Sequence, residues 1–171
     1  MDVDSLRALQ APLKDAYRAD PQAGIVTLKA RGTLDDAHIA CKVETGRAIA
    51  MAGLHPATGG SGAELCSGDM LLEALVACAG VTLKAVATAL EIDLRAATVR
   101  AEGELDFRGT LGVAKDAPVG FSAIRLDFDV DTDAPQEKLD TLLRLTERYC
   151  VVFQTLNVKP ALSASLNVLP A

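Results

Sequence analysis

The sequence is short of aromatic residues and has no basic excess. Its 171 residues include two Tyr, four Phe and no Trp, and 17 Lys and Arg stand against 23 Asp and Glu for a net charge of −6. Nucleic-acid binding needs clustered cations for the phosphates and, on single strands, aromatic side chains on which bases stack. The composition therefore excludes nucleic acid as the expected partner. It also predicts a core of Ala, Leu and Val, which suits helices that lie close together or against another subunit.

Long uncharged runs are also missing. The longest in the apolar helical region is Ala74–Leu83, whereas a membrane span needs about 20 predominantly apolar residues. The first twenty residues carry charges throughout, so no secretion signal is expected. We therefore expect no membrane partner and a cytoplasmic location. In such a reducing compartment, the four cysteines are expected to be free thiols, redox centres or ligands rather than a structural disulfide framework.

The chain begins with a predicted helix and continues with a predicted meander. Leu residues at near-helical spacing indicate a helix over residues 4–18, which Pro12 is expected to kink or shorten. Residues 1–23 are interpreted as an N-terminal arm and 24–171 as a single domain. Alternation of period two predicts strands near residues 25–30, 37–45 and 47–54. A glycine-rich loop follows at residues 55–65.

The second half of the chain is predicted to be helix, two strands, helix and strand. Apolar residues cover nearly every face from Met70 to Leu90, which predicts a long helix buried on most sides, capped by Ser67 or Asp69. Strands are expected at 94–108 and 120–132, and a second helix from Pro135, at its first position, to about Leu156. Residues 161–169 are expected to close the chain as a strand. This order indicates an α+β fold.

The four cysteines do not form a recognisable metal motif. No pair has CxxC spacing, so a zinc site is not expected. An inert core thiol is the simplest reading of Cys41, Cys78 and Cys150. Cys66 is different because it comes just before a predicted helix, whose positive end lowers a thiol pKa. The loop glycines lack the GKS or GKT ending of a phosphate-binding loop, so no nucleotide cofactor is expected.

Two segments resemble the OsmC/Ohr family of osmotically induced and organic hydroperoxide resistance proteins. They are SGDMLLEALVACAGVTL (67–83) and TERYCVVFQTLNV (146–158). The first is similar to the family's helix motif SPxELLLAALAAC, which follows a glycine-rich loop. The second is similar to the pattern E-x-Y-C-P-x-S-x-T-L. Cys78 and Cys150 fall at the two cysteine positions, and the resemblance covers about residues 24 to 168.

The resemblance implies a fold, an assembly and a reaction. Antiparallel sheets would wrap two central helices in an intertwined homodimer, with the active sites at the subunit interface. Family members reduce organic and fatty-acid-type hydroperoxides. Carried over, Cys78 is the peroxidatic thiolate and Cys150 the resolving thiol, and an external dithiol such as a lipoyl group reduces the resulting disulfide. No bound cofactor or metal is implied.

In the peroxidase branch, an Arg near the end of the first strand activates the first cysteine and is held by a Glu. Arg31 is the first candidate for that Arg, and Arg18 is the second. Gly68 stands at the Glu position, followed by Asp69, which is the candidate to hold Arg31. The second motif also departs from the pattern, with Val151 for Pro and Phe153 for Ser.

The sequence and the resemblance leave three hypotheses for the function of the protein. The first is a two-cysteine peroxidase for organic hydroperoxides in oxidative stress defence. The second is an OsmC-like protein that senses redox state or binds an apolar ligand without efficient turnover. The third is a structural protein in which all four thiols are inert.

Overall fold

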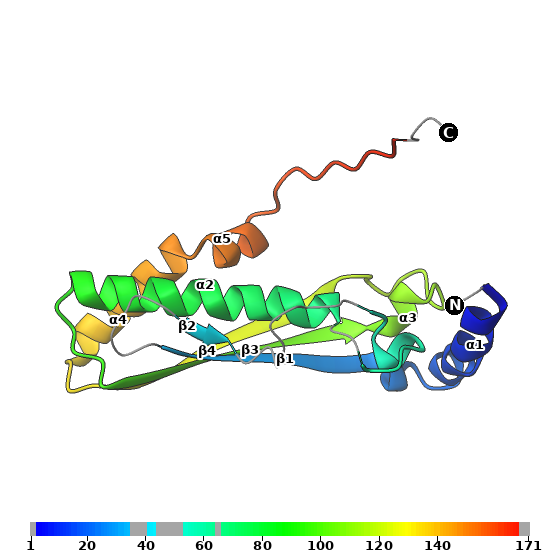
Figure 1. Cartoon of the computed structure of the whole chain (residues 1–171), viewed down its shortest axis with the longest axis horizontal. Coiled ribbons are helices and arrows are strands. Elements are labelled where there is room, and N and C mark those ends of the chain that lie inside the picture. The colour runs from blue at the N-terminus through cyan, green and yellow to red at the C-terminus, as the bar shows by residue number, and fades with distance from the viewer. Residues whose placement is uncertain (1–2, 35–40, 44–52, 64–65, 168–171) are drawn as a thin grey trace.

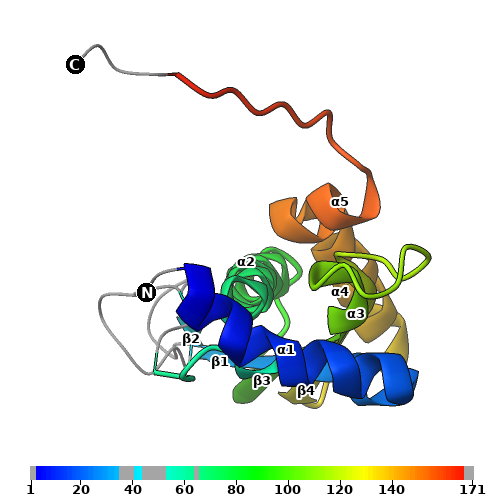
Figure 2. The same ribbon diagram turned by 90° about the vertical axis from the view of Figure 1, so that its right-hand side faces the viewer.

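The computed structural model describes residues 3–34, 41–43, 53–63 and 66–167, and residues 3–7, 9, 10, 27–34 and 41–43 by their backbone alone. Four antiparallel strands form its sheet: β1 (Ile25–Leu34), β2 (Cys41–Val43), β3 (Ala96–Asp106) and β4 (Phe121–Asp131). Their order is β2-β1-β3-β4. The helices lie over one face and one end of the sheet (Figures 1 and 2). The predicted α+β class is confirmed.

The strands predicted at 94–108 and 120–132 are confirmed as β3 and β4. In β4, the apolar residues Ile124, Leu126, Phe128 and Val130 are half-buried, and the charged residues between them are exposed. In β3, Val99 and Ala101 are fully buried under the helices. Of the predicted strand at 47–54, residues 47–52 lie outside the described residues, and 53–54 are not strand.

The long helix α2 (Ser67–Ala89) runs along the sheet, and its buried face carries Leu72, Leu75, Val76, Ala79, Gly80, Leu83 and Ala87. Burial on most sides is not found within one chain, since Leu71 and Val81 are each 37% exposed on its other side. The predicted capping residues are also wrong: Cys66 is the N-cap, with no side-chain capping bond, and Ser67 is already helical. The helix is long and apolar enough to cross a membrane, a criterion that the core helix of a soluble protein also meets.

The second predicted helix is divided in two by a cysteine. α4 (Gln136–Tyr149) has Pro135 as its N-cap rather than its first residue, and α5 (Val151–Asn157) follows. Cys150 between them has an extended backbone, with φ −70° and ψ 107°. Residues 159–167 then leave the body without regular structure, so a closing strand is absent from the described part of 161–169 (Figure 2).

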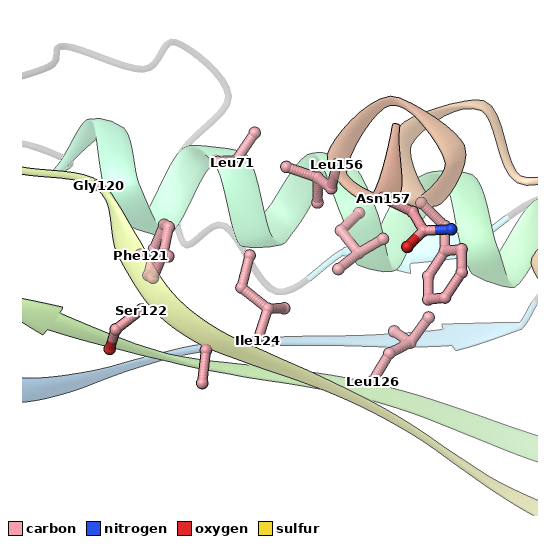
Figure 3. A pocket seen from close by; sticks show the side chains of 11 residues that line it. Leu71, Gly120, Phe121, Ser122, Ile124, Leu126, Leu156 and Asn157 are labelled. Atoms are coloured by element: carbon pink, nitrogen blue, oxygen red, sulfur yellow. The ribbon is translucent and has the colours of Figure 1, made fainter. Parts of the chain in front are cut away.

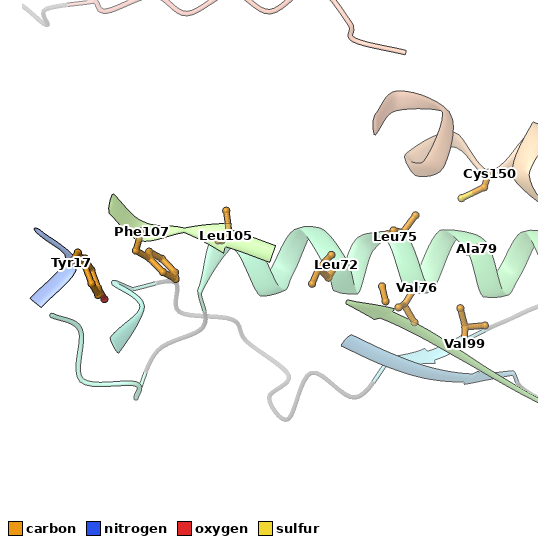
Figure 4. Close-up of a cluster of buried hydrophobic side chains, with 10 residues drawn as sticks. Tyr17, Leu72, Leu75, Val76, Ala79, Val99, Leu105, Phe107 and Cys150 are labelled. Atoms are coloured by element: carbon orange, nitrogen blue, oxygen red, sulfur yellow. The ribbon is translucent and has the colours of Figure 1, made fainter. Parts of the chain in front are cut away.

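The N-terminal helix α1 (Val3–Ala19) contains Pro12 without being shortened by it. Tyr17 is 5% exposed and belongs to the main hydrophobic cluster, at the end near Phe107 and beyond the start of α2 (Figure 4). Its hydroxyl donates to the carbonyl oxygen of Ala57 at 2.7 Å. Ala57 lies in the short 3-10 helix η2 (Pro56–Thr58) of the glycine-rich loop. The predicted arm is thus attached to this cluster through Tyr17, and the boundary at residue 24 stays a prediction.

Candidate functional site

The structure brings Cys78 and Cys150 together. Cys78 lies in the middle of α2, and Cys150 lies at the junction of α4 and α5, with its sulfur directed towards α2 (Figure 4). The two thiol side chains are in hydrogen-bond contact, and both are free rather than joined in a disulfide. Cys78 is half-buried, whereas Cys150 is 0% exposed.

The junction of the two helices fixes the position of Cys150. The first amides of a helix have no partner within it, and the sulfur of Cys150 accepts one of them, from Phe153 at 3.4 Å. Burial raises the pKa of the Cys150 thiol to about 11, and the hydrogen bond and charge of Cys78 act in the same direction. Cys150 is therefore held as a neutral thiol.

The pKa of the Cys78 thiol is shifted the other way. Burial alone would raise it, but hydrogen bonds from the backbone amides of Val152 and Val151 and from the side chains of Cys150 and Thr82 bring it below its ordinary value of 9.0. These four donors are neutral groups. Hydrogen bonds from neutral groups thus contribute to the activation of Cys78 within the described residues, and a further contribution from a positive side chain such as Arg31 stays a prediction.

One departure from the family motif contributes directly to this arrangement. Val151 stands where the motif has Pro, and a Pro has no backbone N–H to donate. The amide of Val151 is one of the donors to Cys78. The substitution therefore adds a hydrogen bond to the sulfur.

An apolar groove of about 500 Å³ lies between α2, α5 and β4 (Figure 3). Leu71 and Leu75 of α2, Phe153 and Leu156 of α5, and the apolar face of β4 line it. Leu75 precedes Cys78 by three residues and is its neighbour on the helix surface. Phe153, where the family motif has Ser, closes the groove near Cys150. The groove can take an extended apolar group, and two of its lining residues, Leu75 and Phe153, each lie three residues along the chain from one of the two cysteines.

The predicted activating clamp is only partly described. Asp69 lies in the first turn of α2, nine residues before Cys78 and thus ~13 Å from it along the axis. Burial raises the pKa of the Asp69 carboxyl, and the charge of His55 lowers it. Arg31 is paired with Arg100 in the β1–β3 ladder. Its side chain lies outside the description, so its contact with Cys78 or Asp69 stays a prediction. Arg18 forms an exposed ion pair with Asp15 at 2.7 Å.

Cys66 is separate from this pair. It lines a second groove of about 410 Å³ at the start of α2, together with His55 and Phe107. The His55 ring stacks on Phe107 with centroids 4.7 Å apart. The side chain of Cys41 and all of His38 lie outside the described residues. Within the described part of the chain, no group of three or more His, Cys, Asp or Glu side chains could hold a metal ion.

Comparison with known proteins agrees with this fold. The profile of OsmC-like proteins matches residues 60–164, which include both cysteines and the helices that carry them. The chain belongs to the OsmC-like protein family.

A solved structure supports the same fold for this OsmC-like chain. It is the crystal structure of an OsmC-like hydroperoxide resistance protein from Jannaschia sp. CCS1, which aligns with a TM-score of 0.61 at 17% sequence identity. The alignment covers 85% of this chain and 95% of the other. No curated protein sequence matches the chain significantly.

Sequence reasoning missed the donors around Cys78. Backbone amides carry no side-chain signal, although the replacement of Pro by Val at position 151 was visible. Thr82, four residues after Cys78, could have been found from the helical spacing of a predicted helix. The break at Cys150 had no such signal, because cysteine is not among the residues that favour an N-cap.

Proposed function

We propose that this OsmC-like protein reduces organic hydroperoxides by a two-cysteine mechanism, with Cys78 as the peroxidatic and Cys150 as the resolving residue. The observation that carries the proposal is the contact between two thiols whose pKa values are shifted in opposite directions. Two interacting acid groups whose pKa values are pushed apart are typical of a site with two chemical roles.

In the first step, the Cys78 thiolate attacks the terminal oxygen of the hydroperoxide R–O–O–H. The S–O bond forms as the O–O bond breaks, so that Cys78 becomes a sulfenic acid and the alkoxide takes a proton to leave as an alcohol. The sulfur is oxidised and the peroxide reduced by two electrons. The lowered pKa of Cys78 supports this role because the thiolate is the nucleophile.

In the second step, Cys150 attacks the sulfenic sulfur, forming the Cys78–Cys150 disulfide and releasing water. The raised pKa of Cys150 arises partly from the hydrogen bond and charge of Cys78. Oxidation to the neutral sulfenic acid removes that charge, so the pKa of Cys150 falls when its thiolate is needed. The order of the two steps thus follows from the coupling of the two thiols.

The substrate is expected to be apolar. The groove between α2, α5 and β4 is lined mainly by Leu, Ile, Ala and Phe side chains, which favour an alkyl or aryl group over a polar one. This supports organic hydroperoxides, including fatty-acid hydroperoxides, over hydrogen peroxide. The solved relative is itself called a hydroperoxide resistance protein.

An external dithiol, such as a lipoyl group, is proposed to complete the cycle. Two thiol–disulfide exchanges would return Cys78 and Cys150 to thiols and oxidise the dithiol. A cytoplasmic location, with its reducing conditions, is proposed because both cysteines are free thiols.

The working unit is proposed to be a homodimer. Leu162 and Leu166 in the C-terminal segment are 89% and 92% exposed, and Leu71 and Val81 are exposed on α2. Exposed apolar side chains on a helix and on an extended segment are typical of surfaces that another chain covers. A second copy would supply a neighbouring strand with which residues 161–167 could pair.

The test is turnover of cumene hydroperoxide with dihydrolipoamide as reductant. We expect turnover by the wild type, none by Cys78→Ser, and a single round of oxidation without turnover by Cys150→Ser. Cys66→Ser is the matched control and should keep full activity. Oxidation of Cys78 without turnover in the wild type would instead support redox sensing. No reaction of any thiol in the native protein would support a structural role.

A further inference from the structure

Thr82 lies one helical turn after Cys78 on α2 and is not one of the two residues that react in the proposed mechanism. Its Oγ1 donates a hydrogen bond to the carbonyl oxygen of Cys78 at 2.8 Å. Side chains on a helix lean towards its N-terminus, so the Thr82 hydroxyl lies over the turn that carries Cys78. The Thr82 side chain is also in hydrogen-bond contact with the Cys78 thiol. The same hydroxyl therefore reaches both the carbonyl oxygen and the sulfur.

We propose that the Thr82 hydroxyl turns from the carbonyl oxygen to the sulfur when Cys78 ionises, and so sets the fraction of thiolate available to a hydroperoxide. A hydroxyl has a single proton to donate, so it serves one acceptor at a time. The carbonyl of Cys78 keeps the backbone amide of Thr82 as its helical donor. Rotation about the Cβ–Oγ bond therefore leaves no acceptor without a partner. The inference rests on the proposed function, because it concerns the same sulfur.

The bond to the carbonyl does not by itself indicate a function. Three other threonines make the same contact with the carbonyl four residues earlier: Thr88 with Lys84, Thr146 with Leu142 and Thr155 with Val151. Threonine side chains in helices commonly make this hydrogen bond. Among these four, only Thr82 has a cysteine at the earlier position. Thr88, exposed on the same helix, therefore provides a matched control.

A hydrogen bond to the thiolate has two opposing effects on rate. It stabilises the charged form and increases the thiolate fraction, because hydrogen bonds to ions are stronger than those between neutral groups. It also lowers the intrinsic nucleophilicity of the sulfur, although less than proportionally. At a pH below the pKa of Cys78, the gain in thiolate is the larger effect. Thr82 is accordingly a positioning residue that acts through Cys78.

The test measures the ionisation of Cys78 in the reduced full-length protein, without peroxide. The rate of alkylation by iodoacetamide is followed against pH, and the peptide Ala74–Glu91, released by cleavage after Glu residues, reports Cys78 alone. We expect Thr82→Val to raise the apparent pKa of Cys78 by about 0.5 to 1 unit, and to slow alkylation at pH 7 by about 3- to 10-fold. The rate on the alkaline plateau should not fall. Thr82→Ser should restore the wild-type profile, and Thr88→Val should not change it.

An unchanged pKa in Thr82→Val would overturn the inference, as would an equal shift in Thr88→Val or a failure of Thr82→Ser to restore the profile. If the Val variant does not fold, Thr82→Ala removes the hydroxyl without adding volume and is read in the same way. Since alkylation needs no peroxide, the role of Thr82 and the proposed peroxidase function can be refuted separately. A shifted pKa with no hydroperoxide turnover would refute the proposed function and leave the role of Thr82 intact.

Discussion

The two thiols should differ in reactivity by at least two orders of magnitude at pH 7. Cys150, with a pKa of about 11, is ionised to about one part in 10,000 at that pH. Cys78 has a pKa below 9.0, so its ionised fraction exceeds about one part in 100. The ratio of thiolate fractions is thus more than about 100, and the complete burial of Cys150 adds to it.

The assay is timed alkylation of the reduced protein with light iodoacetamide, followed by denaturation and labelling of the remaining thiols with the heavy form. Cleavage after Glu residues places each cysteine on a separate peptide, with Cys150 on Arg148–Ala171 and Cys66 on Leu65–Glu73. Cys78→Ser is the second arm. It removes the charge that raises the pKa of Cys150, so Cys150 should react faster in that variant at high pH.

Comparable rates for Cys78 and Cys150 at pH 7 would refute the reasoning. So would an apparent pKa at or above 9.0 for Cys78. Either result would mean that the amides of Val151 and Val152 do not reach the sulfur in solution.

Three further predictions concern single residues. Val151→Pro should slow alkylation of Cys78 at pH 7 by about 3- to 10-fold, because it removes one donor, whereas Val151→Ala keeps the amide and the rate. Tyr17→Phe should lower the free energy of unfolding by about 1 kcal/mol in urea at pH 7. Burial raises the pKa of Tyr17 above 10.0, so the wild type should lose stability as the pH rises above about 10, and the Phe variant less. Leu72→Ala should cost about 2–5 kcal/mol, while Val119→Ala, at an exposed site, should change stability by less than about 0.5 kcal/mol.

Elements with strong local patterns were predictable from the sequence. The alternation of Ile124, Leu126 and Phe128 with charged residues defines β4 because one face of the sheet is half-buried and the other is solvated. The apolar run of α2 was equally clear. Its predicted burial on most sides is not found within one chain, where Leu71 and Val81 are exposed, because composition cannot tell a face covered by the chain's own sheet from one that the chain leaves open.

Features that depend on tertiary contacts were not predictable in the same way. The strand expected at 161–169 has the right composition, but a strand forms only where a neighbouring strand offers hydrogen bonds, and residues 161–167 have none. The contact between Cys78 and Cys150 joins two distant segments through the packing of α5 on α2. The residues alone left both as inert core thiols, and their pairing entered through the family resemblance.

The pairing of Cys78 with Cys150 is tested most directly by titrating the reduced protein with cumene hydroperoxide and mapping its disulfides under non-reducing conditions. One equivalent should consume both thiols of a chain, and should link the peptides Ala74–Glu91 and Arg148–Ala171 with the loss of two hydrogens. Cys66 should remain free. Oxidation of Cys78 that stops at the sulfenic acid, or a disulfide to any other cysteine, would contradict the account.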